Sequence, residues 1–113
     1  MATVAACLAV LALLAVTGLI GQVGVVAVVR HRVQSAADLS ALAGAGALED
    51  GITAGCARAG MVAGRAGFRL DECTVVDWDV IVTVGAEISL AALGSRRVLA
   101  SARAGPVVPY GTE

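Results

Sequence analysis

The chain has 113 residues, 58% of them hydrophobic, and its formal net charge at pH 7 is −1. This near-neutral charge gives no electrostatic case for nucleic-acid binding, which depends on clustered basic residues. With one His and no C-x-x-C pair, the sequence lacks the ligand spacing of a four-ligand zinc site. No nucleophile–base constellation is present, so we expect no enzyme, no metal, no cofactor and no small-molecule substrate.

The first 29 residues carry no charged side chain. As a helix, Ala2–Val29 would span about 42 Å, more than the ~30 Å hydrocarbon core of a bilayer. Residues 1–29 are therefore predicted to be a transmembrane helix in the cell membrane. A cleaved secretory signal is the alternative, but this run lacks a basic n-region and is about twice the length of a typical h-region. Val4-Ala5-Ala6-Cys7 matches a lipoprotein box, yet it precedes the apolar stretch, so Cys7 is predicted to be an apolar helix residue.

Small residues recur within the apolar run. Gly18, Gly21 and Gly24 lie three apart, and such residues let helices approach closely in lipid. Gln22 is a polar side chain in the same stretch, which favours a partner helix over bare lipid. We therefore predict that these four residues pack against another span. The abundance of Ala and Gly in this chain is the alternative explanation.

The helix is predicted to continue outside the membrane over residues 30–50. This stretch has no Pro, and apolar or small residues recur in it at spacings of three and four, which is a helical pattern; they are Val33, Ala36, Ala37, Leu39, Ser40, Ala43, Ala47 and Leu48. Glu49-Asp50-Gly51 is predicted to end the helix, with Gly51 as its C′ residue.

A second, short helix is predicted over Ala54–Gly67, with Thr53 as its cap. Its apolar face would be Ala57, Met61, Val62 and Ala66, while Arg58 and Arg65 would face water. Glycines at 55, 60, 64 and 67 each weaken a helix by about 1 kcal/mol relative to Ala. Such a helix needs packing or a crosslink to hold it.

Period-two alternation after Phe68 predicts three antiparallel strands. The clearest is Val80–Leu90, preceded by Phe68–Val76 through a turn at residues 76–79 and followed, after a connection at Leu93–Arg96, by a strand over Val98–Ala104. The expected fold is α+β and membrane-anchored: a long helix, a short helix and a three-stranded sheet. Residues 51–105 would form a small extracytoplasmic domain, and residues 106–113 a loose tail.

Two cysteines lie outside the span. A bond between Cys56 and Cys73 would close a loop of about 18 residues and is credited with about 3 kcal/mol; two unrelated buried thiols are the alternative. Disulfides persist outside the cytoplasm, which puts the domain outside. Arg30 and Arg32 directly follow the span, and by the positive-inside rule they would place the C-terminal domain in the cytoplasm. The disulfide and the arginines therefore indicate opposite orientations.

The other polar residues are predicted to be solvated. His31 lies between two arginines, and Asp38 is about 10 Å further along the helix, so His31 is expected to be an interfacial residue rather than a catalytic one. Asp71, Glu72, Asp77 and Asp79 cluster near the first hairpin with no partner cation nearby in sequence. They are expected to form a solubilising loop; weak calcium binding is the alternative, although the spacing is not that of an EF-hand.

One motif stands directly after the apolar run. It reads R-x-R-x-Q-x-A-A-D-x-x-A-L-A-x-A and begins at Arg30, with Arg32, Gln34, Ala36, Ala37 and Asp38 as its next defined positions. With the anchor before it, the chain resembles the TadE/TadG-like proteins of tight-adherence (Tad, Flp-type) pilus systems. The short length, the two outer cysteines and the ending Ala102-Arg103-Ala104-Gly105-Pro106 resemble the small actinobacterial TadE-like proteins of a helicase/secretion gene neighbourhood.

The resemblance implies a minor pilin or pseudopilin with its N-terminus in the cytoplasm and its C-terminal domain outside. Its partners would be other pilin or pseudopilin subunits, the Tad membrane assembly platform and the lipid bilayer. The sequence opens Met1-Ala2-Thr3-Val4 without the short basic leader of prepilins. Two other functions therefore stay open: a single-pass envelope protein whose outer domain binds a partner, and a small secreted protein.

Overall fold

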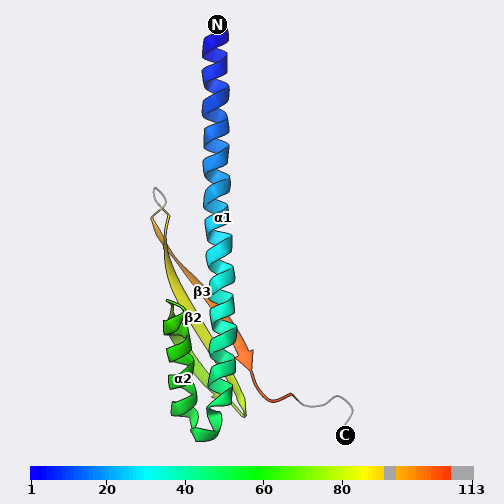
Figure 1. Cartoon of the computed structure of the whole chain (residues 1–113), viewed down its shortest axis with the longest axis vertical. Helices are drawn as coiled ribbons and strands as arrows, with labels where there is room; N and C mark the ends of the chain where they lie inside the picture. Colours follow the sequence, from blue (N-terminus) through cyan, green and yellow to red (C-terminus); the bar gives the residue numbers. More distant parts are fainter. Residues whose placement is uncertain (91–93, 108–113) are drawn as a thin grey trace.

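The computed structural model describes residues 1–90 and 94–107. In chain order it has a 45-residue helix α1 (Ala2–Gly46), a 3₁₀ turn η1 (Leu48–Asp50), a helix α2 (Ile52–Arg65) and strands β1 (Arg69–Val76), β2 (Asp79–Ser89) and β3 (Ser95–Ala104). The strands form an antiparallel sheet in the order β1-β2-β3. The predicted α+β fold is confirmed: the N-terminal half of α1 projects from a head made of the C-terminal half of α1, η1, α2 and the sheet (Figure 1).

Helix α1 runs without a break from the apolar segment into the head, as predicted. It ends at Gly46, earlier than the predicted Glu49-Asp50 boundary, which instead lies in η1. Acidic side chains at a helix C-terminus oppose the helix dipole, and the tighter 3₁₀ turn buries Leu48 against the core. Gly51 then reverses the chain with φ +115°, a backbone conformation that suits glycine.

Helix α2 begins two residues before its predicted start. Gly51 occupies the N-cap position with no side-chain cap hydrogen bond, so the prediction that Thr53 caps this helix is wrong. The chain enters α2 directly from the turn at Gly51, and Thr53 therefore lies inside the first turn of the helix. The helix ends at Arg65, and Gly67, with φ +86°, leads into β1.

The face that α2 buries differs from the predicted one. Gly55, Ala59 and Ala63 are buried, whereas Met61 is 50% exposed. A Cβ on Gly55 would lie 2.9 Å from the carbonyl oxygen of Gly44 in α1, so the two helices touch almost backbone to backbone. A stripe of small residues allows this approach, and larger side chains are excluded from it; the predicted face of Ala57, Met61, Val62 and Ala66 is wrong for this reason.

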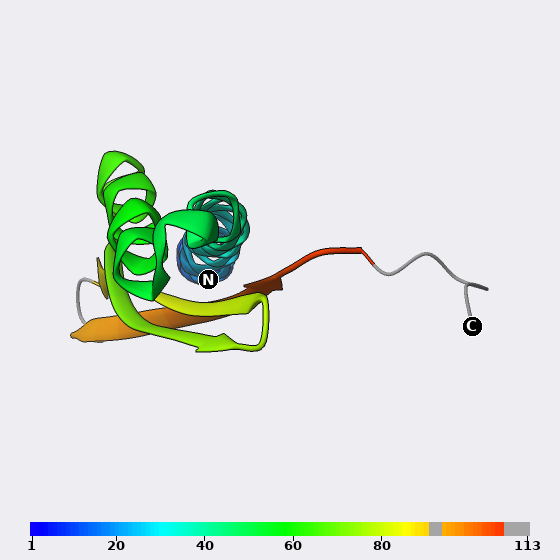
Figure 2. The same ribbon diagram turned by 90° about the horizontal axis from the view of Figure 1, so that it is seen from below.

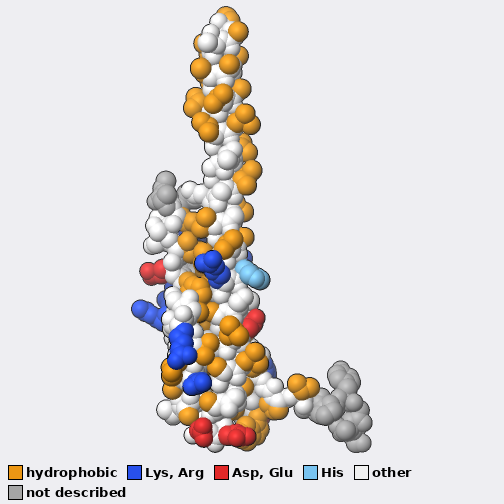
Figure 3. Space-filling model, in the orientation of Figure 1, with side chains coloured by type: hydrophobic (Ala, Val, Ile, Leu, Met, Phe, Trp, Pro, Cys, Tyr) orange, Lys and Arg blue, Asp and Glu red, His pale blue; other side chains and the backbone are white. Residues whose placement is uncertain are grey.

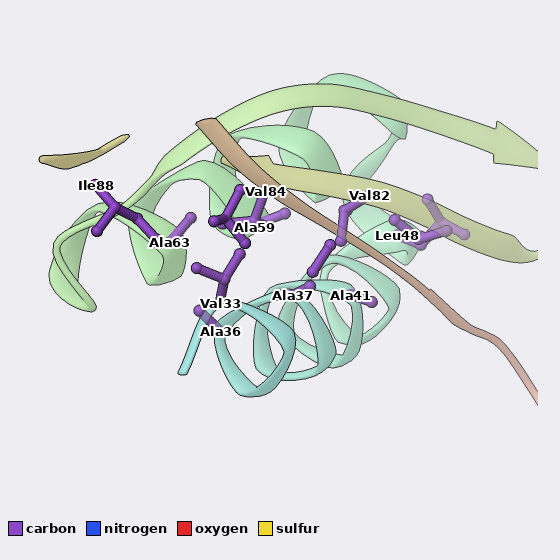
Figure 4. Packing of buried hydrophobic residues seen from close by; sticks show 13 residues of the cluster. Val33, Ala36, Ala37, Ala41, Leu48, Ala59, Ala63, Val82, Val84 and Ile88 are labelled. Atoms are coloured by element: carbon purple, nitrogen blue, oxygen red, sulfur yellow. The ribbon is translucent and has the colours of Figure 1, made fainter. Parts of the chain in front are cut away.

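The two helices lie on the same side of the sheet and make a two-layer head (Figure 2). Alternate residues of β2 point to the helices, and Val80, Val82 and Val84 are fully buried. Val98 and Ala100 of β3 complete that face. Figure 4 shows the core between them; on α1 it is lined by Val33, Ala36, Ala37 and Ala41. Strand β1 carries a bulge between Leu70 and Glu72.

The connections follow the predicted turns with one change. Asp77 has φ +56° in the β1–β2 turn, a conformation that Asp tolerates without glycine. Of the predicted connection Leu93–Arg96, Gly94 has φ +81°, but Ser95 and Arg96 already belong to β3. Residues 105–107 are outside regular structure. The rest of the predicted loose tail, residues 108–113, and residues 91–93 of the β2–β3 connection lie outside the described residues.

The backbone contact between α1 and α2 predicts opposite effects at two glycines of α2. We expect Gly55→Ala to destabilise the head by about 1–3 kcal/mol, because the new methyl group overlaps the Gly44 carbonyl. Gly64→Ala is the matched control: nothing lies within 4 Å of its Cβ position, so the higher helix propensity of Ala should stabilise by about 0.5–1 kcal/mol. Thermal unfolding of the detergent-solubilised chain, followed by circular dichroism, measures both. Equal effects would contradict the packing described for α2.

Candidate functional site

The most unusual surface of this molecule is the N-terminal part of α1. Residues 1–21 are all exposed, and none carries a charged side chain. Large apolar side chains here lie open to the surroundings, among them Leu8 at 62% exposure and Leu13 at 68%. We call this uncharged N-terminal part of α1 the rod. In Figure 3 it stands above the head, and every charged side chain visible in that view lies on the head. The helix is long and apolar enough to cross a membrane by length and composition, and none of its most apolar window is buried in the head.

The head begins to cover α1 inside the apolar run. Gln22, Val26 and Val29 are half-buried, and with the buried Val33 they form one helix face at spacings of three and four. Leu90, which directly follows β2, lines the same groove as Gln22 and Val26. No sequence pattern predicts this shared groove, because residues 22 and 90 are brought to it only by the tertiary fold.

The predicted helix-packing residues lie at the lower part of the rod. Gly18, Gly21 and Gly24 have no atom within 4 Å of their Cβ positions, so their surface is open to a neighbouring helix. Gln22 lies on the head-facing side, and its Oε1 atom is buried without a hydrogen-bond partner among the described residues. Packing of these four residues against another span stays a prediction.

The R-x-R-x-Q-x-A-A-D motif divides by helix face. Ala36 and Ala37 are buried against the sheet, whereas Arg30 and Arg32 are exposed. Gln34 Nε2 donates to the backbone carbonyl of Ser101 on β3 at 3.2 Å and to Asp38 Oδ1 at 3.2 Å. Gln34 thus ties α1 to β3, and Asp38 accepts a second hydrogen bond from the same amide group. His31 is exposed and lines the groove that contains Leu90.

Two of the four clustered acidic residues have cationic partners, which corrects the expectation of a simple solvated loop. Asp71 Oδ2 lies 2.5 Å from Arg97 on β3, and Asp79 pairs with Arg103. The first pair reaches across β2 at Gly85, where a Cβ would come within 2.6 Å of Asp71 Oδ2. Ion pairs of this exposure contribute about 0–1 kcal/mol. The sequence analysis missed them because each pair joins residues more than 20 positions apart.

A disulfide joins Cys56 of α2 to Cys73 of β1, with a Cα–Cα distance of 5.9 Å and a sequence separation of 17. It fastens the glycine-rich helix to the sheet edge where α2 packs. Cys7 is free and exposed on the rod. Within residues 1–90 and 94–107, no three His, Cys, Asp or Glu side chains gather as a metal site.

These features describe an α+β protein built on one long N-terminal helix with a candidate membrane span. Residues 1–47 match the sequence profile of the Tad family, described as "Putative Flp pilus-assembly TadE/G-like". This confirms, over that part of the chain, the family resemblance inferred from the motif at Arg30–Ala45. The matched segment contains the whole of α1, including both the rod and the face that packs on the head.

A protein of Mycobacterium tuberculosis named "Apoptosis inhibitor Rv3654c" is 50% identical to this chain over 54 residues. The alignment covers 48% of this chain and 64% of that protein, which is less than two thirds of its length. No solved structure matches the chain.

The disulfide predicts the reactivity of the three thiols. When the unreduced protein is denatured, a maleimide should modify Cys7 alone, because Cys56 and Cys73 are joined. After reduction it should modify all three. A bond closing a loop of this size contributes about 3 kcal/mol, so reduction should also lower the unfolding temperature of the head. Modification of three cysteines without reductant, measured by mass spectrometry, would remove the crosslink.

Proposed function

We propose that this chain is a minor pilin or pseudopilin of a Tad-type pilus or secretion system, a non-enzymatic structural or assembly component. One observation carries the proposal: the uncharged, wholly exposed start of α1 is continuous with a folded head. The TadE/G-like match covers that same helix. An apolar rod of this length suits a membrane before assembly and the packed helices of neighbouring subunits afterwards.

A structural role is also the simplest account of the polar residues described above. Gln34 donates both to Asp38 and to the backbone of β3, and Asp71 and Asp79 are held in ion pairs. His31 is exposed on α1. Each of these groups has a role in holding the head on the helix or in facing solvent, and our proposal assigns none of them to catalysis.

The proposed orientation puts the N-terminus in the cytoplasm and the head outside. The Cys56–Cys73 disulfide supports this side, because disulfides persist in oxidising compartments. Arg30 and Arg32 favour the opposite side under the positive-inside rule. We give the disulfide more weight, since the rule describes a statistical bias in insertion whereas a cytoplasmic head would be exposed to reducing conditions.

The proposed partners are other pilin or pseudopilin subunits and the Tad assembly platform, and the proposed contact is the open glycine surface of α1. We expect Gly21→Leu to reduce co-purification with the other pilus components at least about fivefold, because the side chain would hold helices apart that pack through small residues. Membrane insertion should be unaffected, since Leu is more apolar than Gly. Gly46→Leu is the matched control, an open position on the same helix but within the head. Equal recovery with both variants would contradict a packing role for Gly21.

The printed name of the relative, an apoptosis inhibitor, supplies a different candidate function, for which we consider a small secreted protein. The mature N-terminus distinguishes the two functions. We expect mass spectrometry of the protein from its native host to find the apolar run Ala2–Val29 retained. Loss of the run would identify a small secreted protein.

A further inference from the structure

We infer that the hydrocarbon core of the membrane ends at Gly21–Gln22 rather than at Val29, so that only Ala2–Gly21 contacts lipid chains and the last paired residues of β2 and β3, Ser89 and Ser95, lie at the membrane surface. This inference rests on the proposed membrane anchoring of α1. Under this inference, lipid surrounds Ala2–Gly21, whereas residues 22–29, the last third of the apolar run, are the face on which the head docks.

The hairpin lies beside the last third of the apolar run. Ala86 of β2 lines a groove with Val29, while Leu90 lines another with Val26 and Gln22. In Figure 1 the β2–β3 hairpin extends along α1 well above the top of α2. If the hydrocarbon reached Val29, this part of the hairpin would be immersed in it.

The backbone of the hairpin is unsuited to hydrocarbon. Strand β1 pairs with β2 only as far as Arg69↔Gly85, whereas β2 and β3 pair up to Ser89↔Ser95. The β1-side edge of residues 86–89 is therefore without a strand partner in the described sheet. Open sheet edges do not occur facing lipid chains, because unpaired N–H and C=O groups there have no water to bond.

A charged residue leads to the same boundary. Arg96 is exposed and lines one groove with Val26 and Leu90. No ion pair to Arg96 is formed within the part of the chain that the structure describes. A hydrocarbon core that reached Val29 would place this guanidinium near the depth of lipid chains, where charged side chains are among the costliest groups to bury. With the boundary at Gly21–Gln22, Arg96 lies on the aqueous side.

The length of the remaining segment fits one bilayer. Ala2–Gly21 is about 20 residues and about 30 Å of helix, which equals the thickness of a typical hydrocarbon core. The full run to Val29, at about 42 Å, would need a tilt of about 45° to fit, beyond the usual range for membrane helices of about 0–40°. Helix length, the hairpin edge and Arg96 therefore agree on one boundary.

Cysteine accessibility in a lipid-only system tests this boundary. The full chain carrying Cys7→Ala, with the disulfide intact, is reconstituted into sealed phosphatidylcholine vesicles at high lipid-to-protein ratio, and a membrane-impermeant maleimide is added. Probes are placed at Leu14 and Val28, which are 64% and 54% exposed in the chain itself, so protection reports lipid rather than the head. The control is Gly46→Cys, an open position at the far end of α1.

We expect Val28→Cys to react within about threefold of the control rate and Leu14→Cys to react at least about tenfold more slowly, because the reactive thiolate forms in water and not in hydrocarbon. Protection of Val28→Cys to the level of Leu14→Cys would place the boundary at Val29 and overturn the inference, with the anchoring intact. Reaction of Leu14→Cys at the control rate would show that α1 is not in lipid, and would overturn the proposed anchoring as well.

Discussion

The architecture depends on one constraint: a single unbroken helix must suit two different surroundings. Residues 1–21 lie outside the head and carry only uncharged side chains. From Gln22 onward the same helix presents a face to its own sheet and to α2. The helix is the only long element in the described chain, so the head is organised around its C-terminal half and every other element packs on it directly or through one neighbour.

The head that packs on this helix is made of small residues. Gly44 and Gly55 bring α1 and α2 together almost at backbone distance, and Ala59 and Ala63 continue the contact. Close approach gives many dispersion contacts, but little apolar area is buried per residue, so the hydrophobic contribution at ~25 cal/mol per Å² is modest. A disulfide between Cys56 and Cys73 compensates by limiting the unfolded chain, and it ties the element richest in glycine to the sheet.

The sheet lies beside the last part of the apolar run of α1, where the sequence suggested that the helix is surrounded by lipid. Because β2 and β3 are longer than β1, their hairpin extends past the rest of the head along α1. The apolar residues from Gln22 to Val29 therefore have two potential surroundings, lipid and protein, and hydropathy alone does not separate them. This is why an apolar run and a membrane-embedded segment need not have the same length.

Local pattern was enough to determine the fold class. The uncharged run before Arg30 indicates one helix in an apolar environment, and the alternation through Val80–Leu90 indicates one strand with a single buried face. Each signal comes from neighbouring residues of one element, so it can be read from the sequence. What only the tertiary structure decided involves pairs of elements. The buried face of α2 follows Gly55 rather than Met61, because backbone contact with α1 selects for small size over hydrophobicity. The Asp71–Arg97 pair and the groove that Leu90 lines together with Gln22 likewise exist only once distant segments are side by side. Sequence periodicity reports which face of an element is apolar, whereas the partner of that face depends on how closely the backbones can approach.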